Sequence, residues 1–168
     1  MLLNDGAGFD FARAGTGYKL GFKLPRRSGY TVGMKRLPRI VMVEDDPMIQ
    51  NMYDKALTFA GFDVSISPDG TIVLEAARVS PPDLILMDVM MPNFNGLEAL
   101  KEIKDGIGTS SIPVIMLSAY DDQNLIDQAL ALGAERYLIK SQYEPQEVID
   151  IIKEILAKRG ITTKPRRA

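Results

Sequence analysis

The sequence predicts an α/β fold in which helices cover both faces of a five-stranded parallel sheet. From Arg39 onward, short apolar segments alternate with longer segments whose apolar residues recur at helical spacing. The segment Leu84–Met87 is apolar without a break and is bounded by turn residues, which is typical of a strand buried on both faces. Five strand and helix pairs fit within about 120 residues, a normal size for one doubly wound domain.

The first part of this region is expected to contain two strands and two helices. The strands are expected at residues 40–43 and 62–66. Pro47 suits the first turn of a helix that ends at Gly61. The apolar stripe of this helix is expected to comprise Met48, Ile49, Met52, Tyr53, Ala56, Leu57, Phe59 and Ala60. A second helix is expected to be capped by Asp69 and to extend through Val79, with buried candidates that include Ile72, Leu74 and Ala76.

The later elements follow the central strand Leu84–Met87. A loop is expected from Pro92 to Gly96, and Asn95 with Glu98 resembles a capping box for the next helix. Gly133 is expected to close the helix that follows. The remaining elements are expected to be a helix with Leu97, Leu100 and Ile103, a strand at 113–117, a helix with Leu125, Ile126, Ala129 and Leu130, a strand at 137–139 and a helix at 145–158.

Composition excludes several classes of site and of protein. The 168 residues include no cysteine and no histidine, which excludes disulfides, thiol nucleophiles, Ser-His-Asp triads and imidazole-based zinc sites. No apolar run approaches the roughly 20 residues that span a bilayer, and the start resembles no secretory signal, so we expect a cytoplasmic protein without membrane contact. Residues 34–168 have a net charge of −5, which argues against direct nucleic-acid binding.

The two ends are expected to lie outside the folded domain. Residues 1–36 are expected to be a flexible extension, because residues 1–33 contain seven glycines and little periodicity. Within them, residues 18–24 alternate as a half-buried strand would, although a poorly ordered extension is the favoured interpretation. Met34 is a second candidate for the start of translation. The domain itself is expected at 37–159, followed by a basic tail at 160–168.

Polar residues follow the expected strands at their carboxyl ends. They are Glu44, Asp45 and Asp46 after the first strand, Asp88 after the third, Ser118 after the fourth and Lys140 after the fifth. In a flavodoxin-like strand order of 2-1-3-4-5, the first and third strands are neighbours, so Asp45 and Asp88 should face each other. Carboxylates at that separation repel unless a cation lies among them, and an all-oxygen site with few protein ligands favours Mg²⁺.

A lysine and a hydroxyl complete the expected site. Lys140 and Ser118 offer a positive charge and a short hydrogen bond to phosphoryl oxygens, which indicates phosphate chemistry. Asp88 is then the nucleophile, and its attack on phosphorus would form an acyl phosphate. Taken singly, each of these residues has a simpler interpretation: the acids as helix caps, Ser118 as a turn residue, Lys140 as a surface lysine and Tyr137 as part of the core.

The motifs VEDD, LMDVMMPNFNG, VIMLSA and YLIK, in this order and at strand ends, resemble the receiver domain of two-component response regulators. The resemblance covers about Arg39 to Lys158 and is closest to the stand-alone kind related to chemotaxis and sporulation regulators. It implies that Asp88 accepts a phosphoryl group from a sensor histidine kinase or phosphotransfer protein. It also implies that Mg²⁺ is held by Asp45, Asp88 and the backbone carbonyl of Met90, with Glu44 nearby to hold a metal-bound water.

The same resemblance implies a switch. Lys140 would pair with the phosphoryl group, Ser118 would move toward it and the ring of Tyr137 would turn inward. The fourth helix, fifth strand and fifth helix would then be read by a downstream protein target, with a homodimer as a further expected product of phosphorylation. Output through another protein, or through the rest of a longer regulator, is expected.

The chain departs from the family pattern at two positions, and the residues at two variable positions also matter. Ser141 replaces the proline that commonly follows the lysine in a cis bond, and Ser118 replaces the commoner threonine but keeps its hydroxyl. Met90 and Tyr120 occupy the two variable positions that flank the phosphorylation site. Neither side chain orients an attacking water as well as a carboxylate or amide would, so slow self-hydrolysis is expected.

Two other functions remain to be weighed. A phosphatase or phosphotransferase of the haloacid dehalogenase type also uses an aspartyl nucleophile, but it carries a second aspartate two residues later, where this chain has Met90. A degenerate receiver that acts only as a docking module would lack the acid pair or the lysine, and both are present. The sequence contains no Gly-rich phosphate-binding loop, which argues against an NTPase or a dinucleotide enzyme.

Overall fold

The computed structural model describes residues 36–70 and 73–163. By its contacts the chain divides into a unit at Met1–Thr31 and a unit at Val32–Ala168, and the described residues all belong to the second unit. The expected flexible extension up to residue 35, the strand-like residues 18–24, Met34 and the end of the basic tail lie outside the described residues. The expected domain boundaries therefore stay predictions.

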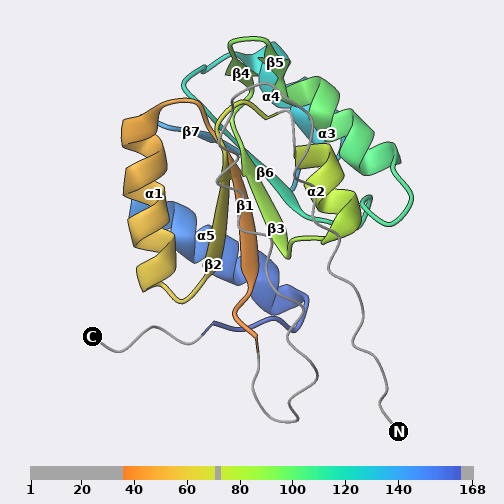
Figure 1. Cartoon of the computed structure of the whole chain (residues 1–168). Helices are drawn as coiled ribbons and strands as arrows, with labels where there is room; N and C mark the ends of the chain where they lie inside the picture. The colour runs from red at the N-terminus through yellow and green to blue at the C-terminus, as the bar shows by residue number, and fades with distance from the viewer. Residues whose placement is uncertain (1–35, 71–72, 164–168) are drawn as a thin grey trace, which may run out of the picture. The chain divides into compact units, whose positions relative to one another are not determined.

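Five parallel strands form the central sheet in the order β2-β1-β3-β6-β7 (Figure 1). The strands are β1 (Arg39–Val43), β2 (Asp63–Ser67), β3 (Leu84–Met87), β6 (Val114–Ser118) and β7 (Arg136–Ile139). Counted as five strands in chain order, this is the predicted arrangement 2-1-3-4-5. All four residues of β3 are buried, as expected of an apolar strand at the centre of a covered parallel sheet.

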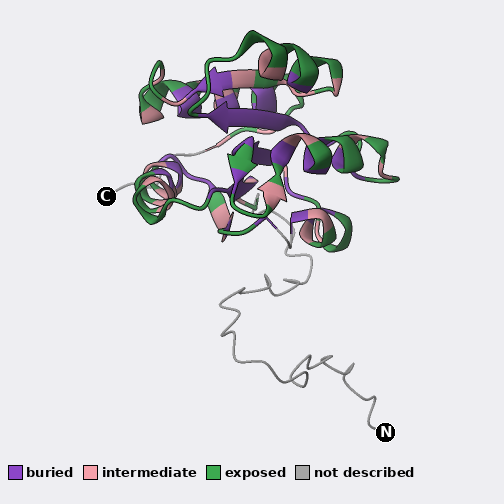
Figure 2. Cartoon of the chain, turned by 90° about the horizontal axis from the view of Figure 1, so that it is seen from above, coloured by how far each residue is buried: buried purple, intermediate pink, exposed green. Residues whose placement is uncertain are grey.

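Helices cover both faces of the sheet, and the buried residues lie between the layers (Figure 2). One core cluster joins the sheet to α1 (Pro47–Phe59) and α5 (Pro145–Lys158). The other joins it to α2 (Val73–Val79), α3 (Gly96–Asp105) and α4 (Gln123–Ala131). The predicted doubly wound α/β fold is therefore confirmed. Among the described helices, none is long and apolar enough to cross a membrane.

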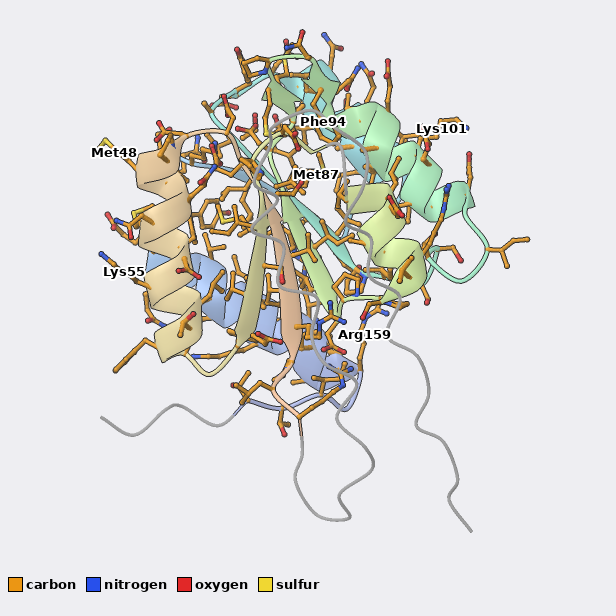
Figure 3. The ribbon with its side chains drawn as sticks, in the orientation of Figure 1. Met48, Lys55, Met87, Phe94, Lys101 and Arg159 are labelled. Atoms are coloured by element: carbon orange, nitrogen blue, oxygen red, sulfur yellow. The ribbon has the colours of Figure 1, made fainter. Side chains whose placement is uncertain are left out.

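The first helix buries less of its apolar surface than the sequence predicts. Tyr53 and Leu57 are buried, but Met48, Met52 and Phe59 are 82%, 43% and 67% exposed. In Figure 3, Met48 extends away from α1, whereas Met87 lies within the sheet. The expected apolar stripe is therefore only partly buried, because a helix packed on one face of a sheet buries only part of its circumference.

Smaller differences concern α2 and the first loops. Val73 and Ala77 are the buried residues of α2, whereas the expected Leu74 and Ala76 are only half-buried and Ile72 lies outside the described residues. The first helix ends at Phe59, and Gly61 follows its cap residue Ala60 with φ 93°, as expected of a glycine that closes a helix. Gly133 follows the last turn of α4 with φ 95°, which confirms the predicted helix end.

A short antiparallel hairpin replaces the loop that the sequence predicts after β3. Strands β4 (Met90–Met91) and β5 (Phe94–Asn95) pair with each other, and Asn93 at the turn has φ 61°. Gly96 follows, and its backbone N–H donates to the carbonyl of Val89 at 2.8 Å. A Cβ at Gly96 would overlap the backbone oxygen of Asp88. The hairpin thus returns the chain directly against the residue that ends β3.

Substitution of Gly96 by alanine is expected to destabilise the domain. Because the overlap is with backbone, the hairpin must shift, at a cost of about 1–3 kcal/mol in the free energy of unfolding. Gly108→Ala is the matched control: its Cβ meets nothing within 4 Å, so only the positive φ of 82° opposes it, at about 1 kcal/mol. Urea unfolding followed by circular dichroism measures both. Equal losses would contradict the close approach at Gly96.

Candidate functional site

The candidate site lies where the parallel strands end together. Val43 is in register with Met87 in the sheet, and Met87 is in register with Met116 of β6. Beyond β3, the backbone N–H of Asp88 donates to the carbonyl of Val43 at 2.9 Å. Beyond β7, the N–H of Lys140 donates to the carbonyl of Ser118 at 2.7 Å. The sheet's own hydrogen bonding therefore brings the four predicted strand-end positions to one edge.

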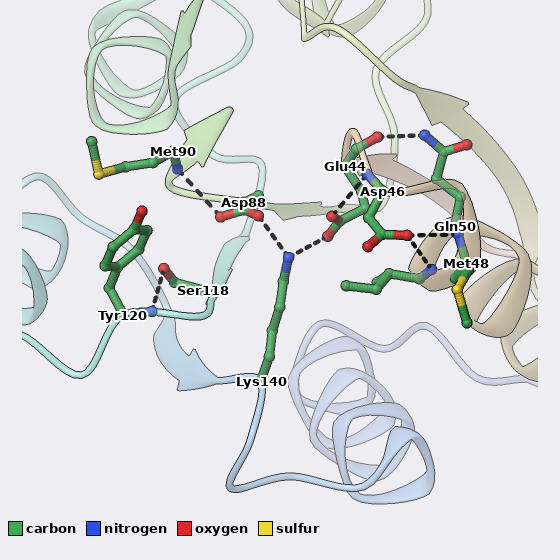
Figure 4. A network of polar contacts seen from close by, with 10 residues as sticks. Glu44, Asp46, Met48, Gln50, Asp88, Met90, Ser118, Tyr120 and Lys140 are labelled. Carbon is green, nitrogen blue, oxygen red and sulfur yellow. Dashed lines mark hydrogen bonds and ion pairs between the residues drawn. The ribbon is translucent and has the colours of Figure 1, made fainter. Parts of the chain in front are cut away.

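The Lys140 ammonium joins two of these carboxylates (Figure 4). Its Nζ lies 2.6 Å from Asp88 Oδ2 and 2.7 Å from Glu44 Oε2. Glu44 is 1% exposed and Asp88 is 6% exposed. A buried carboxylate is costly without a partner, so the ammonium is what makes this burial tolerable. The presence of Ser141 after Lys140 does not keep the lysine from reaching Asp88.

The pKa values of both Glu44 and Lys140 are raised at this site. Burial raises the pKa of the Glu44 carboxyl, and the nearby charge of Asp88 adds to this, while Lys140 opposes it. For Lys140, burial works to lower the pKa of the ammonium, but the hydrogen bonds and charges of Asp88 and Glu44 outweigh it and the pKa is raised. The two directions have different main causes: burial for Glu44, and the two neighbouring carboxylates for Lys140.

A third carboxylate makes the imbalance larger. Oxygen atoms of Glu44, Asp45 and Asp88 lie within 4.8 Å of one another, an arrangement that could hold a metal ion. Three carboxylates against the one ammonium of Lys140 leave a formal charge of −2, and hard oxygen ligands suit a small divalent cation. The residues therefore fit the expected Mg²⁺. In contrast, Asp46 caps α1, accepting from the N–H of Met48 at 2.7 Å.

Met90 touches the predicted nucleophile through its backbone. Its N–H donates to Asp88 Oδ1 at 3.3 Å, while its side chain is 55% exposed. Among the described residues, Asp88 has one oxygen bound to Lys140, and the other accepts only a long hydrogen bond, from Met90. This second oxygen is therefore the less strongly bound of the two. The role expected for the Met90 carbonyl as a metal ligand stays a prediction.

The side-chain hydroxyl groups of Ser118 and Tyr137 both form hydrogen bonds with the backbone of Tyr120. Ser118 is fully buried, and its Oγ accepts from the N–H of Tyr120 at 3.2 Å. The hydroxyl of Tyr137 donates to the carbonyl of Tyr120 at 2.9 Å, and the Tyr137 side chain is half-buried. Burial raises the pKa of this hydroxyl. Ser118 and Tyr137 therefore hold the same short segment, although the expected switch is a motion that one structure does not test.

Sequence reasoning missed one residue that orders the site. Gln50, in the first turns of α1, donates from Nε2 to the backbone carbonyl of Glu44 at 2.7 Å. This bond ties the helix to the loop that carries Glu44 and Asp45. A glutamine near the start of a helix is common on protein surfaces, so no pattern in the sequence distinguishes it.

The chain is similar to a known domain family and to several transcriptional regulators. The family model for the response regulator receiver domain matches residues 40–153. The transcriptional regulatory protein BaeR of Escherichia coli O6:H1 is 37% identical over 132 residues, which cover 77% of this chain and 51% of BaeR. The chain spans about half the length of the curated relatives it matches.

Solved structures agree with this match. A CheY-like response regulator receiver domain protein from Methanospirillum hungatei is 27% identical with a TM-score of 0.69, covering 74% of this chain and 97% of that one. The receiver domain of the sensor histidine kinase PA1611 from Pseudomonas aeruginosa is 28% identical with a TM-score of 0.66, covering 72% and 98%. That structure has a magnesium ion coordinated in its active-site cleft.

The raised pKa of Glu44 predicts a pH-dependent stability difference between the wild type and Glu44→Gln. A carboxyl whose folded pKa lies above its unfolded value of about 4.5 contributes most stability below that value and loses it as the pH rises through the folded pKa. In EDTA, the free energy of unfolding of Glu44→Gln minus that of the wild type should therefore increase between pH 4 and 7. Urea titrations measure this difference, and Glu102→Gln, at an exposed carboxylate on α3, is the control. A difference that shrinks with pH would contradict the assignment.

Proposed function

This chain belongs to the response regulator receiver domain family, and we propose that Asp88 accepts a phosphoryl group from a sensor histidine kinase or phosphotransfer protein in an Mg²⁺-dependent reaction. The observation that carries the proposal is the placement of the Lys140 ammonium between Asp88 and Glu44, with Asp45 beside them. This combination supplies a nucleophile, a cation for phosphoryl oxygens and an oxygen-lined metal site. It also speaks against a degenerate receiver, which would lack one of these parts.

The chemistry is the transfer of a phosphoryl group from a phosphohistidine to the carboxylate of Asp88. Asp88 Oδ1 attacks phosphorus, the bond from phosphorus to the donor imidazole nitrogen breaks, and an aspartyl phosphate and a free imidazole result. Lys140 keeps its place beside Asp88 and pairs with the transferred phosphoryl oxygens. Asp45, Asp88 and the Met90 carbonyl would hold Mg²⁺, with Glu44 nearby; when bound, the ion offsets negative charge that develops on phosphoryl oxygens. The receiver promotes only its own phosphorylation and dephosphorylation, so we do not regard it as a classical enzyme.

The phosphorylation signal would be transmitted through Ser118 and Tyr137, whose hydroxyl groups bind the backbone of Tyr120. If Ser118 moves toward the phosphoryl group, it releases the N–H of Tyr120 and disturbs the segment to which Tyr137 is bound. The ring of Tyr137 can then turn inward, which changes the surface formed by α4, β7 and α5. A downstream protein target would bind that surface, and homodimer formation is a second use for it.

The proposed location of the chain follows from the location of its phosphoryl donor. A histidine kinase or phosphotransfer protein presents its phosphohistidine in the cytoplasm, which is the location proposed for this chain. Because BaeR is a transcriptional regulator of which the chain matches about half, the expected absence of direct nucleic-acid contact stays a prediction.

Acetyl phosphate with Mg²⁺ should modify Asp88 alone. Intact mass should increase by one phosphoryl group, and peptide mapping should place it on Asp88; Asp88→Asn should stay unmodified. Asp45→Asn should lower the initial rate by about tenfold or more, since it removes a proposed metal ligand. Asp63→Asn, at an exposed carboxylate away from the site, is the control. Modification of the Asp88→Asn variant at the same rate would refute the proposal.

The phosphorylated state is expected to be long-lived, because neither Met90 nor Tyr120 orients water well. Met90→Asn combined with Tyr120→Glu should accelerate the loss of phosphate from Asp88 by about tenfold, because an amide and a carboxylate would position the attacking water. Both side chains are half exposed or more, so the fold should tolerate the changes. Phosphate release after removal of acetyl phosphate measures the rate. A fast wild-type decay that the double variant leaves unchanged would show this explanation to be wrong.

A further inference from the structure

The exposed sulfur atoms of this protein are unevenly placed. The chain has nine methionines and no cysteine, so thioethers are its only sulfur groups. In the described part of the chain, Met42, Met87, Met91 and Met116 are buried. The exposed methionines there are Met48 and Met52 on α1 and Met90 beside Asp88, at 82%, 43% and 55% exposure. Of these three, Met90 alone contacts the predicted nucleophile.

Met90 is placed to influence what reaches Asp88 from solvent. Its backbone N–H donates to Asp88 Oδ1, so its side chain begins next to the oxygen that would carry the phosphoryl group. In Figure 4 this side chain extends over the side of the site where Tyr120 lies. Tyr120 is 50% exposed, and we call the exposed, uncharged side chains of Met90 and Tyr120 the rim of the site. Water that approaches Asp88 from this side meets these two side chains.

We propose that Met90 is an oxidation site and that its sulfoxide shortens the life of phosphorylated Asp88, an inference that rests on the proposed function. The oxidant is hydrogen peroxide: a sulfur–oxygen bond forms, the peroxide O–O bond breaks, sulfur loses two electrons and water is released. A thioether is a weak hydrogen-bond acceptor, whereas a sulfoxide oxygen is a strong one. The change therefore adds an acceptor to the rim without altering the length of the side chain.

The sulfoxide oxygen would act on the attacking water. Sδ of methionine stands at the same distance along the side chain as Cδ of glutamine, so the sulfoxide oxygen corresponds to the amide Oε1. Either oxygen can accept a hydrogen bond from a water aimed at phosphorus, which a thioether does poorly. The expected acceleration is about fivefold, the rate equivalent of one hydrogen bond of ordinary net strength. Reduction of the sulfoxide would restore the slow state, since this oxidation is reversible.

The experiment compares four proteins before and after hydrogen peroxide: the wild type, Met90→Leu, Met90→Gln and the double variant Met48→Leu with Met52→Leu. Each is phosphorylated with acetyl phosphate and Mg²⁺, exchanged into buffer and followed by phosphate release, while peptide mass spectrometry measures oxidation at each methionine. Met90→Leu keeps an apolar side chain that peroxide cannot oxidise. Met90→Gln imitates the oxidised state, and the double variant removes the two exposed thioethers that lie away from Asp88.

Support requires that peroxide accelerates phosphate release about fivefold in the wild type and in the double variant but not in Met90→Leu. Met90→Gln should release phosphate at the faster rate without peroxide, and methionine sulfoxide reductase should restore the wild-type rate. Oxidation of Met90 without a change in rate would overturn the inference, as would an equal response in Met90→Leu, or a Met90 that stays reduced while Met48 oxidises. If no phosphate enters Asp88 in any protein, the proposed function itself fails, and that outcome is seen before peroxide is added.

Discussion

One ammonium facing three carboxylates is the constraint around which this domain is built. Lys140 lies between Asp88 and Glu44, and Asp45 stands within reach of both. Asp45 is exposed, but Glu44 and Asp88 are buried, and buried charges are stable only if their partners are held in place. The parallel sheet meets this condition, because the strands that precede Glu44, Asp88 and Lys140 end at the same edge. Hydrogen bonds such as the one from Asp88 N–H to Val43 fix the register of those ends.

The hydrophobic core provides the stability that holds this group of charges in place. Apolar residues fill both sides of β3, and the two clusters that include α1 with α5 and α2 with α3 and α4 enclose the sheet. The segments that leave the sheet are in turn secured locally: Asp46 caps α1, Gln50 binds the carbonyl of Glu44, and Gly96 brings the β4–β5 hairpin against Asp88. A site that carries excess negative charge is thus held by elements that are themselves fixed by hydrogen bonds and close packing.

The sheet and the site were largely predictable because they depend on the same simple pattern. An apolar run such as Leu84–Met87 identifies a central strand, and a charged residue directly after it must lie at the sheet edge. The sequence analysis placed Asp45 rather than Asp46 opposite Asp88, and in the structure Asp45 joins the acid group whereas Asp46 caps a helix. It did not reveal β4 and β5, because two-residue strands have no period. For α1, apolar residues occur on more than one face, and packing against the sheet and α5 decides which are covered.

At this site two carboxylates are buried, while uncharged side chains near them are exposed to solvent. Glu44 and Asp88 are buried, whereas the rim presents Met90 and Tyr120 to solvent. An apolar rim makes few hydrogen bonds to water and is readily covered by an apolar surface of another protein. Both properties suit a carboxylate that must receive a phosphoryl group from a macromolecular donor and then keep it from hydrolysis. In the proposed function, the chemistry at the centre would form the aspartyl phosphate, and the side chains of the rim would determine how long it lasts. Polarity at residue 90 would then affect the signal rather than the fold.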